Sequence, residues 1–75
     1  MELFETVVLL EDLPGTPFIK GDIATLVEIY ASGKGCELEF FAVDGTTLGV
    51  EAAPLKAIMS CKGLKRVLHI VDIAA

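Results

Sequence analysis

The sequence predicts an all-β fold, and three observations support this prediction. Between Lys20 and Phe40, two runs rich in Ile, Val, Leu and Phe flank a turn cluster at 32–35 (SGKG), which is a β-hairpin signature. The segment 36–42 (CELEFFA) alternates with a period of two, as expected for a strand with one face on a core. A tight-turn pair, Asp44-Gly45, follows it directly.

The other elements of the first 52 residues follow from composition and turn chemistry. The run at 3–10 (LFETVVLL) predicts a strand buried on both sides, or one with a core face and a contact face. Prolines and glycines make 11–21 a long loop, in which we expect Phe18 and Ile19 to pack down onto the core. We expect further strands at 22–31, 36–42 and 46–52.

The last third of the chain predicts a helical turn and a final strand. Residues 53–57 (APLKA) break the fourth strand, and proline suits the first position of a helical turn. Lys62-Gly63 marks a turn, and Arg66–Ile73 (RVLHIVDI) has the alternation of a last strand. Five strands, a long loop after the first and a helical turn before the last describe a small SH3-like barrel. Residues 1–75 are expected to form one domain.

The composition fits a small core with apolar surface left over. The chain has 75 residues, of which 53% are hydrophobic. A body this small cannot bury every large apolar side chain, and such a surplus is often covered by another protein or another copy. We therefore expect a homodimer.

Charge is distributed unevenly along the chain. Residues 1–51 carry ten carboxylates against two lysines, and residues 52–75 carry a net charge of +3. An acidic body repels phosphate backbones, so nucleic-acid binding is disfavoured. The glutamates Glu28, Glu37 and Glu39 are expected on an acidic outer surface of the sheet. The basic end of the chain is either a set of solvated side chains or a patch that meets an acidic partner.

Cysteine content and hydropathy indicate a cytoplasmic protein with reduced thiols. The first residues (MELFETVV) lack the basic region and the small-residue cleavage site of a secretory leader. No apolar run is long enough to span a bilayer. Cys36, Cys61 and the single His69 are a poor set of zinc ligands.

Four motifs of the chain resemble a known bacterial family. LFETVVLLEDLP, KGDIATLVEIY, CELEFFAVDGTTLGV and APLKAI, which together span roughly Leu3–Ser60, are similar to the uncharacterised family called domain of unknown function 4926. The resemblance implies an SH3-like barrel, often encoded near toxin or restriction-type genes, and it implies no catalytic residues. Ala24 stands where the family usually has Gly. If residues near 57–60 already close the barrel, 66–73 is an added strand that lies on an edge or exchanges between copies.

No residue set in the chain predicts catalysis, a cofactor or a metal. His69 lies within an apolar strand pattern and has no partner base or nucleophile nearby in sequence. Lys62 next to Cys61 can lower the pKa of that thiol, which would make it more reactive. Asp12 and Asp22 are interpreted as turn residues that accept backbone N–H groups, because the loop lacks a cation-binding spacing.

The sequence therefore favours a non-enzymatic protein-interaction module. It would serve as an accessory subunit or as the antitoxin-like partner of a basic protein, since the acidic body suits a cationic surface. The candidate contact residues are Tyr30, Phe41, Lys62, Lys65 and Arg66. The alternative is a nucleic-acid-binding barrel, which requires the basic residues from Lys56 to Arg66 to gather on one face with Phe41 or Tyr30. An enzyme is the third alternative.

Overall fold

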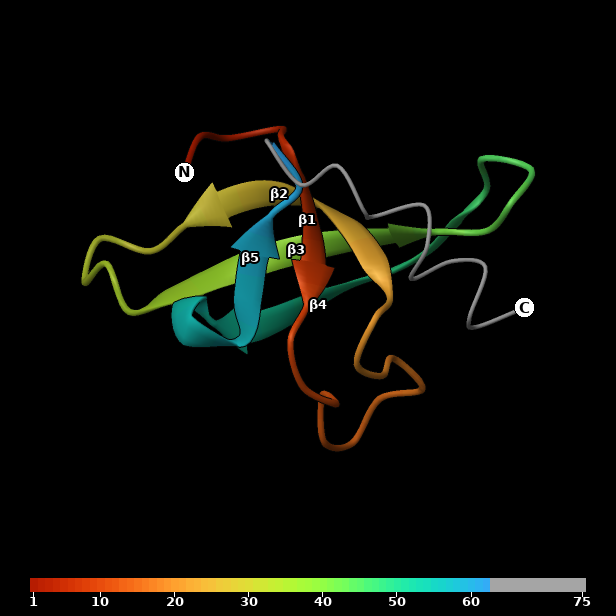
Figure 1. Ribbon diagram of the computed structural model, residues 1–75, viewed down its shortest axis with the longest axis horizontal. Helices are drawn as coiled ribbons and strands as arrows, with labels where there is room; N and C mark the ends of the chain where they lie inside the picture. Colours follow the sequence, from red (N-terminus) through yellow and green to blue (C-terminus); the bar gives the residue numbers. More distant parts are fainter. Residues whose placement is uncertain (63–75) are drawn as a thin grey trace.

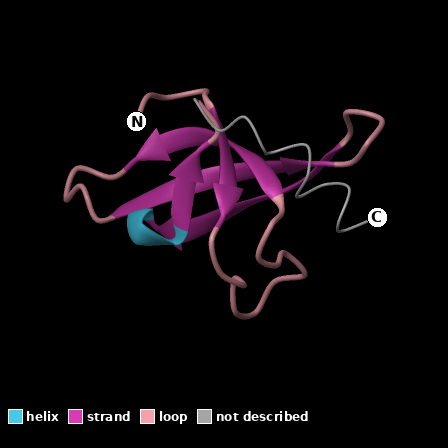
Figure 2. Ribbon diagram, in the orientation of Figure 1, coloured by secondary structure: helices cyan, strands magenta, loops and turns pink. Residues whose placement is uncertain are grey.

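The computed structural model describes residues 1–62 and shows one antiparallel sheet (Figures 1 and 2). Its elements are β1 (Thr6–Leu9), β2 (Ile23–Ile29), β3 (Gly35–Phe41), β4 (Thr47–Pro54), the 3₁₀ helix η1 (Leu55–Ala57) and β5 (Ile58–Ser60). The strand order is β4-β3-β2-β1-β5, so β4 and β5 are the two edges. The predicted all-β class, the five strands and the helical turn before the last of them are confirmed.

The fifth strand differs from the expected one. β5 pairs with β1 through Val8 and Met59, whereas the predicted strand Arg66–Ile73 lies outside the described residues. The family resemblance had left open that residues near 57–60 complete the fold, and β5 occupies that place. Three residues are too few to show an alternating pattern, which is why composition did not reveal this strand.

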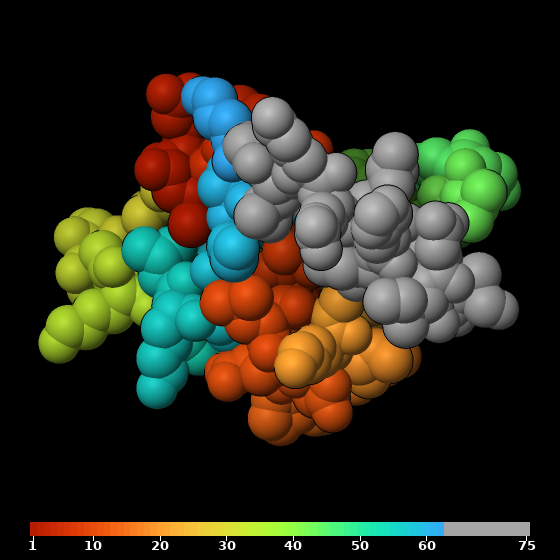
Figure 3. Space-filling model, viewed as in Figure 1, coloured from red at the N-terminus to blue at the C-terminus, as the bar shows by residue number. Residues whose placement is uncertain are grey.

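Both predicted hairpin turns are confirmed, and each uses a glycine in the left-handed region. Gly33 has φ 74° and donates its N–H to the Tyr30 carbonyl at 2.8 Å. Gly45 has φ 88°, and the Asp44 side chain accepts the Thr46 N–H at 2.9 Å. A side chain with a Cβ rarely adopts such φ values, so these turns fix the register of the strands on either side. The tips of the two hairpins protrude on opposite sides of the molecule (Figure 3).

The long loop between β1 and β2 is held by its acidic residues, as predicted. Asp12 accepts the Lys20 N–H and Asp22 accepts the Ile19 N–H, each at 2.9 Å. Phe18 is buried, but Ile19 is 55% exposed, so the expectation that both pack on the core is wrong for Ile19. The reason is the tight turn from Ile19 to Asp22, closed by a backbone hydrogen bond of 3.0 Å, which leaves the Ile19 side chain in solvent.

The core lies between the sheet and the long loop. Phe18 from the loop stacks on Phe40 of β3 with ring centroids 3.8 Å apart and planes at 7°. The period-two face predicted for β3 is confirmed, because Cys36, Leu38 and Phe40 are all buried. β1 is buried on both faces along its last three residues, Val7 to Leu9.

Candidate protein-interaction face

Three glutamates gather on the outer face of the β2–β3–β4 sheet, and we call them the acidic face: Glu28, Glu37 and Glu39. Glu28 on β2 and Glu37 on β3 are direct cross-strand partners. Glu39 is the partner of Thr25 on one side and Val50 on the other. Because the alternate residues of β3 are buried, Glu37 and Glu39 lie on the outer face, where both are half-buried, and Glu28 on β2 is exposed. The acidic outer surface predicted from the sequence is therefore a single patch.

The carboxylates of the acidic face receive hydrogen bonds from neutral hydroxyl groups. The Tyr30 hydroxyl donates to Glu37 Oε2 and the Thr47 hydroxyl donates to Glu39 Oε2, each at 2.9 Å. Among residues 1–62, the one ion pair joins Lys62 Nζ and Glu2 Oε2 at 4.0 Å, away from this patch. Like charges directly opposite on adjacent strands destabilise a sheet, so the Glu28–Glu37 pair lowers stability in the free protein.

Tyr30 borders the acidic face and is held in place by the hairpin. Its N–H donates to the Gly35 carbonyl at 2.9 Å, and its ring lies against Gly35 so closely that a Cβ there would be 2.7 Å from Tyr30 Cδ2. The hydrogen bond to Glu37 is the main cause that raises the pKa of Tyr30, followed by burial and by the charges of Glu37 and Glu28. The phenol is thus a neutral donor beside two carboxylates.

This environment predicts the titration of Tyr30. A raised pKa in the folded state means that folding favours the neutral phenol. The hydrogen-bonded phenol therefore stabilises the fold fully below the ordinary pKa of 10.0, and this stabilisation is lost as the pH rises through the pKa of Tyr30 in the folded state. The chain has one tyrosine and no tryptophan, so the tyrosinate absorbance reports this group alone. We expect a midpoint above 10.0 in the native protein and a lower one in Glu37→Gln. An unchanged midpoint in that variant would contradict the assigned cause.

Phe41 lies far from Tyr30, although the sequence placed both among the candidate contacts. Tyr30 is hydrogen-bonded to Gly35, the first residue of β3, and Phe41 is the last residue of that strand. The seven extended residues of β3 place Gly35 and Phe41 about 20 Å apart. Phe41 is 41% exposed and lines an apolar groove of about 350 Å³ between the long loop and the β3–β4 hairpin. The structure therefore separates these two aromatic side chains.

The described basic residues are also separated. Lys56 lies in η1 and Lys62 follows β5, so they are at opposite ends of that strand. Lys62 is exposed and lines a shallow groove with Glu5, Thr6 and Cys61. Lys65 and Arg66 lie outside the described residues. The grouping that the nucleic-acid alternative requires is not formed by Lys56 and Lys62.

The prediction of a more reactive Cys61 is wrong in direction. Burial, and then the negative charge of Glu5, raise the pKa of the Cys61 thiol. The position of Lys62 next to Cys61 in the sequence predicted a lowered pKa, but the charge that affects this thiol is that of Glu5. Burial also raises the pKa of Cys36, whose Sγ donates to the Ala53 carbonyl at 3.5 Å.

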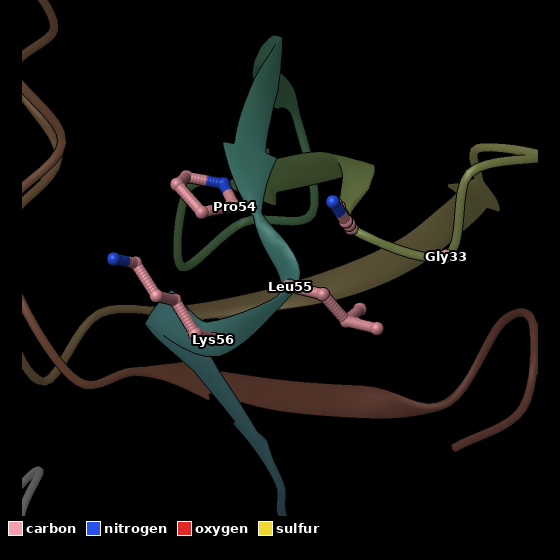
Figure 4. A pocket seen from close by; sticks show the side chains of 5 residues that line it. Gly33, Pro54, Leu55 and Lys56 are labelled. Atoms are coloured by element: carbon pink, nitrogen blue, oxygen red, sulfur yellow. The ribbon is translucent and has the colours of Figure 1, made fainter.

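A second surface feature is a groove of about 600 Å³ between the β2–β3 turn and η1 (Figure 4). Its lining residues are Gly33, Lys34, Pro54, Leu55 and Lys56. The Leu55 N–H donates to the Lys34 carbonyl at 2.9 Å and so fixes η1 against the turn. This groove contains two lysines and no carboxylate, in contrast to the acidic face.

Residues 1–62 contain no cluster of three or more His, Cys, Asp or Glu side chains arranged to hold a metal ion. In the same part of the chain, no helix is long and apolar enough to cross a membrane.

The comparison with protein families identifies the family of this chain. The family model described as "Domain of unknown function (DUF4926)" matches residues 3–60, which run from before β1 to the end of β5. The chain belongs to this family. Searches of curated proteins and of solved structures found no match. The DUF4926 match therefore covers the five strands of residues 1–62 and the acidic face, and it supports the resemblance seen in the motifs.

Proposed function

We propose that this DUF4926 protein is a non-enzymatic bacterial interaction module whose acidic face binds a positively charged segment of a partner protein. The observation that supports this proposal most directly is the cross-strand pair of Glu28 and Glu37 with Tyr30 beside it. A cationic side chain placed between Glu28 and Glu37 removes the repulsion between their like charges. Relief of this repulsion adds to the free energy of binding.

The chemistry of the patch favours arginine over lysine in the bound segment. A guanidinium group binds a carboxylate with two parallel hydrogen bonds and stacks on an aromatic ring, and the acidic face offers carboxylates next to the Tyr30 ring. An accessory subunit, or the antitoxin-like partner of a basic protein in the cytoplasm, is a role that such a face would serve. The ten carboxylates of residues 1–62, against four lysines, would also steer a basic partner towards the module.

The test is calorimetric titration of the full chain with an arginine-rich peptide, and with lysine-rich and neutral peptides of the same length. We expect the arginine-rich peptide to bind most tightly and to weaken as salt is added. The variant Glu28→Gln/Glu37→Gln/Glu39→Gln should bind it about tenfold more weakly, because three surface charge pairs contribute roughly 0.5 kcal/mol each.

The matched control removes the same net charge elsewhere, with Glu2→Gln/Glu11→Gln/Glu51→Gln. Its affinity should change far less than that of the acidic-face variant. Equal losses in the two variants would show that binding follows net charge alone, and the proposed site would then be wrong. No binding of the arginine-rich peptide by the native chain would also reject it.

A further inference from the structure

A row of apolar side chains crosses the outer surface of the sheet, beside the acidic face. The register pairs Val8 of β1 with Met59 of β5 on one side and with Ile23 of β2 on the other, so the three side chains share one surface. Phe41 of β3 and Leu48 of β4 line a common groove with Ile23 and continue the row. We call these five residues the apolar band.

The middle of the apolar band is covered, although it faces away from the core. Val7 and Leu9 belong to the core cluster, so Val8 between them points to the opposite surface of the sheet. Val8 is nevertheless only 3% exposed. Towards the two ends of the band, Met59 is 39% exposed and Phe41 is 41% exposed. A continuous row of large apolar side chains on the outside of a small protein is typical of a docking surface.

We propose that residues 64–73 of the same chain (LKRVLHIVDI) dock on the apolar band. Six of these ten residues are large and apolar, and all ten lie outside the described residues. The described chain ends at Lys62, directly after β5, where the Cys61 N–H donates to the Thr6 carbonyl at 2.9 Å. The segment therefore starts close to the Met59 end of the band.

The length and the charge of the segment suit this surface. The band runs from β5 to β3, which is three strand spacings or about 14 Å, and residues 63–75 can reach about 40 Å when extended. Lys65 and Arg66 outnumber Asp72 in the segment, whereas residues 1–62 carry ten carboxylates against four lysines. Asp22 also lines the groove at the far end of the band. Opposite net charges therefore attract the segment to the folded part of the chain.

Covalent linkage favours the chain's own segment over another molecule as the occupant of the apolar band. A segment joined to its site by a few residues has an effective concentration in the millimolar range. A second copy of the chain at micromolar concentration competes poorly with such a segment. Docking is therefore independent of protein concentration, which distinguishes it from an interface between copies.

The test is limited trypsin digestion of the full chain, in which cleavage after Lys65 and Arg66 is compared with cleavage of a synthetic peptide of residues 61–75. A docked segment must open before the protease can cut it. We expect cleavage at least about tenfold slower in the chain than in the peptide, at the same rate from low to high micromolar protein. Met59→Ser and Phe41→Ser each bring the rate towards that of the peptide.

Two controls separate docking from general stability. Val50→Ser changes an apolar side chain of the outer surface that is 51% exposed and lies outside the apolar band, and it leaves cleavage after Lys65 and Arg66 unchanged. Cleavage after Lys20, in the long loop between β1 and β2, reports opening of the folded part. Its rate stays the same in the native chain and in the three variants.

Three outcomes would overturn the proposal. Cleavage of the native chain at the rate of the peptide would show that the segment is not docked. Protection that appears only as the protein concentration rises would assign the band to a second copy. Protection that Met59→Ser and Phe41→Ser leave as unchanged as Val50→Ser does would place the segment on another surface.

Discussion

Phe40→Ala is expected to lower the free energy of unfolding by about 3–5 kcal/mol, which is the usual cost of truncating a buried aromatic side chain. Phe40 is 2% exposed and stacks on Phe18, so its removal leaves a cavity and also frees the anchor of the long loop. Small domains have roughly 5–15 kcal/mol of stability in total, so this loss would unfold a large fraction of the molecules near physiological temperature.

Urea unfolding followed by circular dichroism measures this effect, and the next residue along the chain provides the control. Phe41 has the same side chain but is 41% exposed, so Phe41→Ala should cost about 1 kcal/mol or less. Similar losses in the two variants would mean that the two faces of β3 are assigned wrongly. A larger loss for Phe40→Ala confirms that the long loop is held on the sheet by this ring pair.

The parts of the fold that the sequence predicted are those with local signals. The alternation of 36–42 and the two glycine turns depend on residues close together in the chain, and the structure contains both features. β5 is too short for such a signal and becomes a strand because it pairs with β1, about fifty residues earlier. Ile19 is exposed for a similar reason, since the turn at Asp22, and not its hydrophobicity, sets its direction.

The candidate site was predictable in composition but not in geometry. Glu28, Glu37 and Glu39 could be assigned to an outer surface from alternation alone. That Glu28 lies directly opposite Glu37 depends on the irregularity in β2 between Leu26 and Glu28, which shifts the register by one residue. No sequence signal marks this shift, and the contact of Tyr30 with Glu37 depends on it as well.

Gly35→Ala tests whether the hairpin positions Tyr30 on the acidic face. The new Cβ would lie 2.7 Å from Tyr30 Cδ2, so the ring must move away, and overpacking of this kind costs about 1–3 kcal/mol. A displaced ring also loses its hydrogen bond to Glu37, so the tyrosinate midpoint should fall towards the ordinary 10.0. Urea unfolding and the absorbance titration together measure both consequences.

Gly49→Ala is the matched control for this prediction, because it places the same methyl group on the adjacent strand. Its Cβ would meet Glu51 Oε2 at 3.8 Å and the Phe18 ring at 4.0 Å, which are ordinary contacts. We therefore expect little loss of stability and an unchanged Tyr30 titration. If Gly35→Ala left the Tyr30 midpoint where Gly49→Ala leaves it, the ring would not be positioned by Gly35. Tyr30 could then not act as a fixed platform for a guanidinium group, and the preference for arginine would have to come from the carboxylates alone.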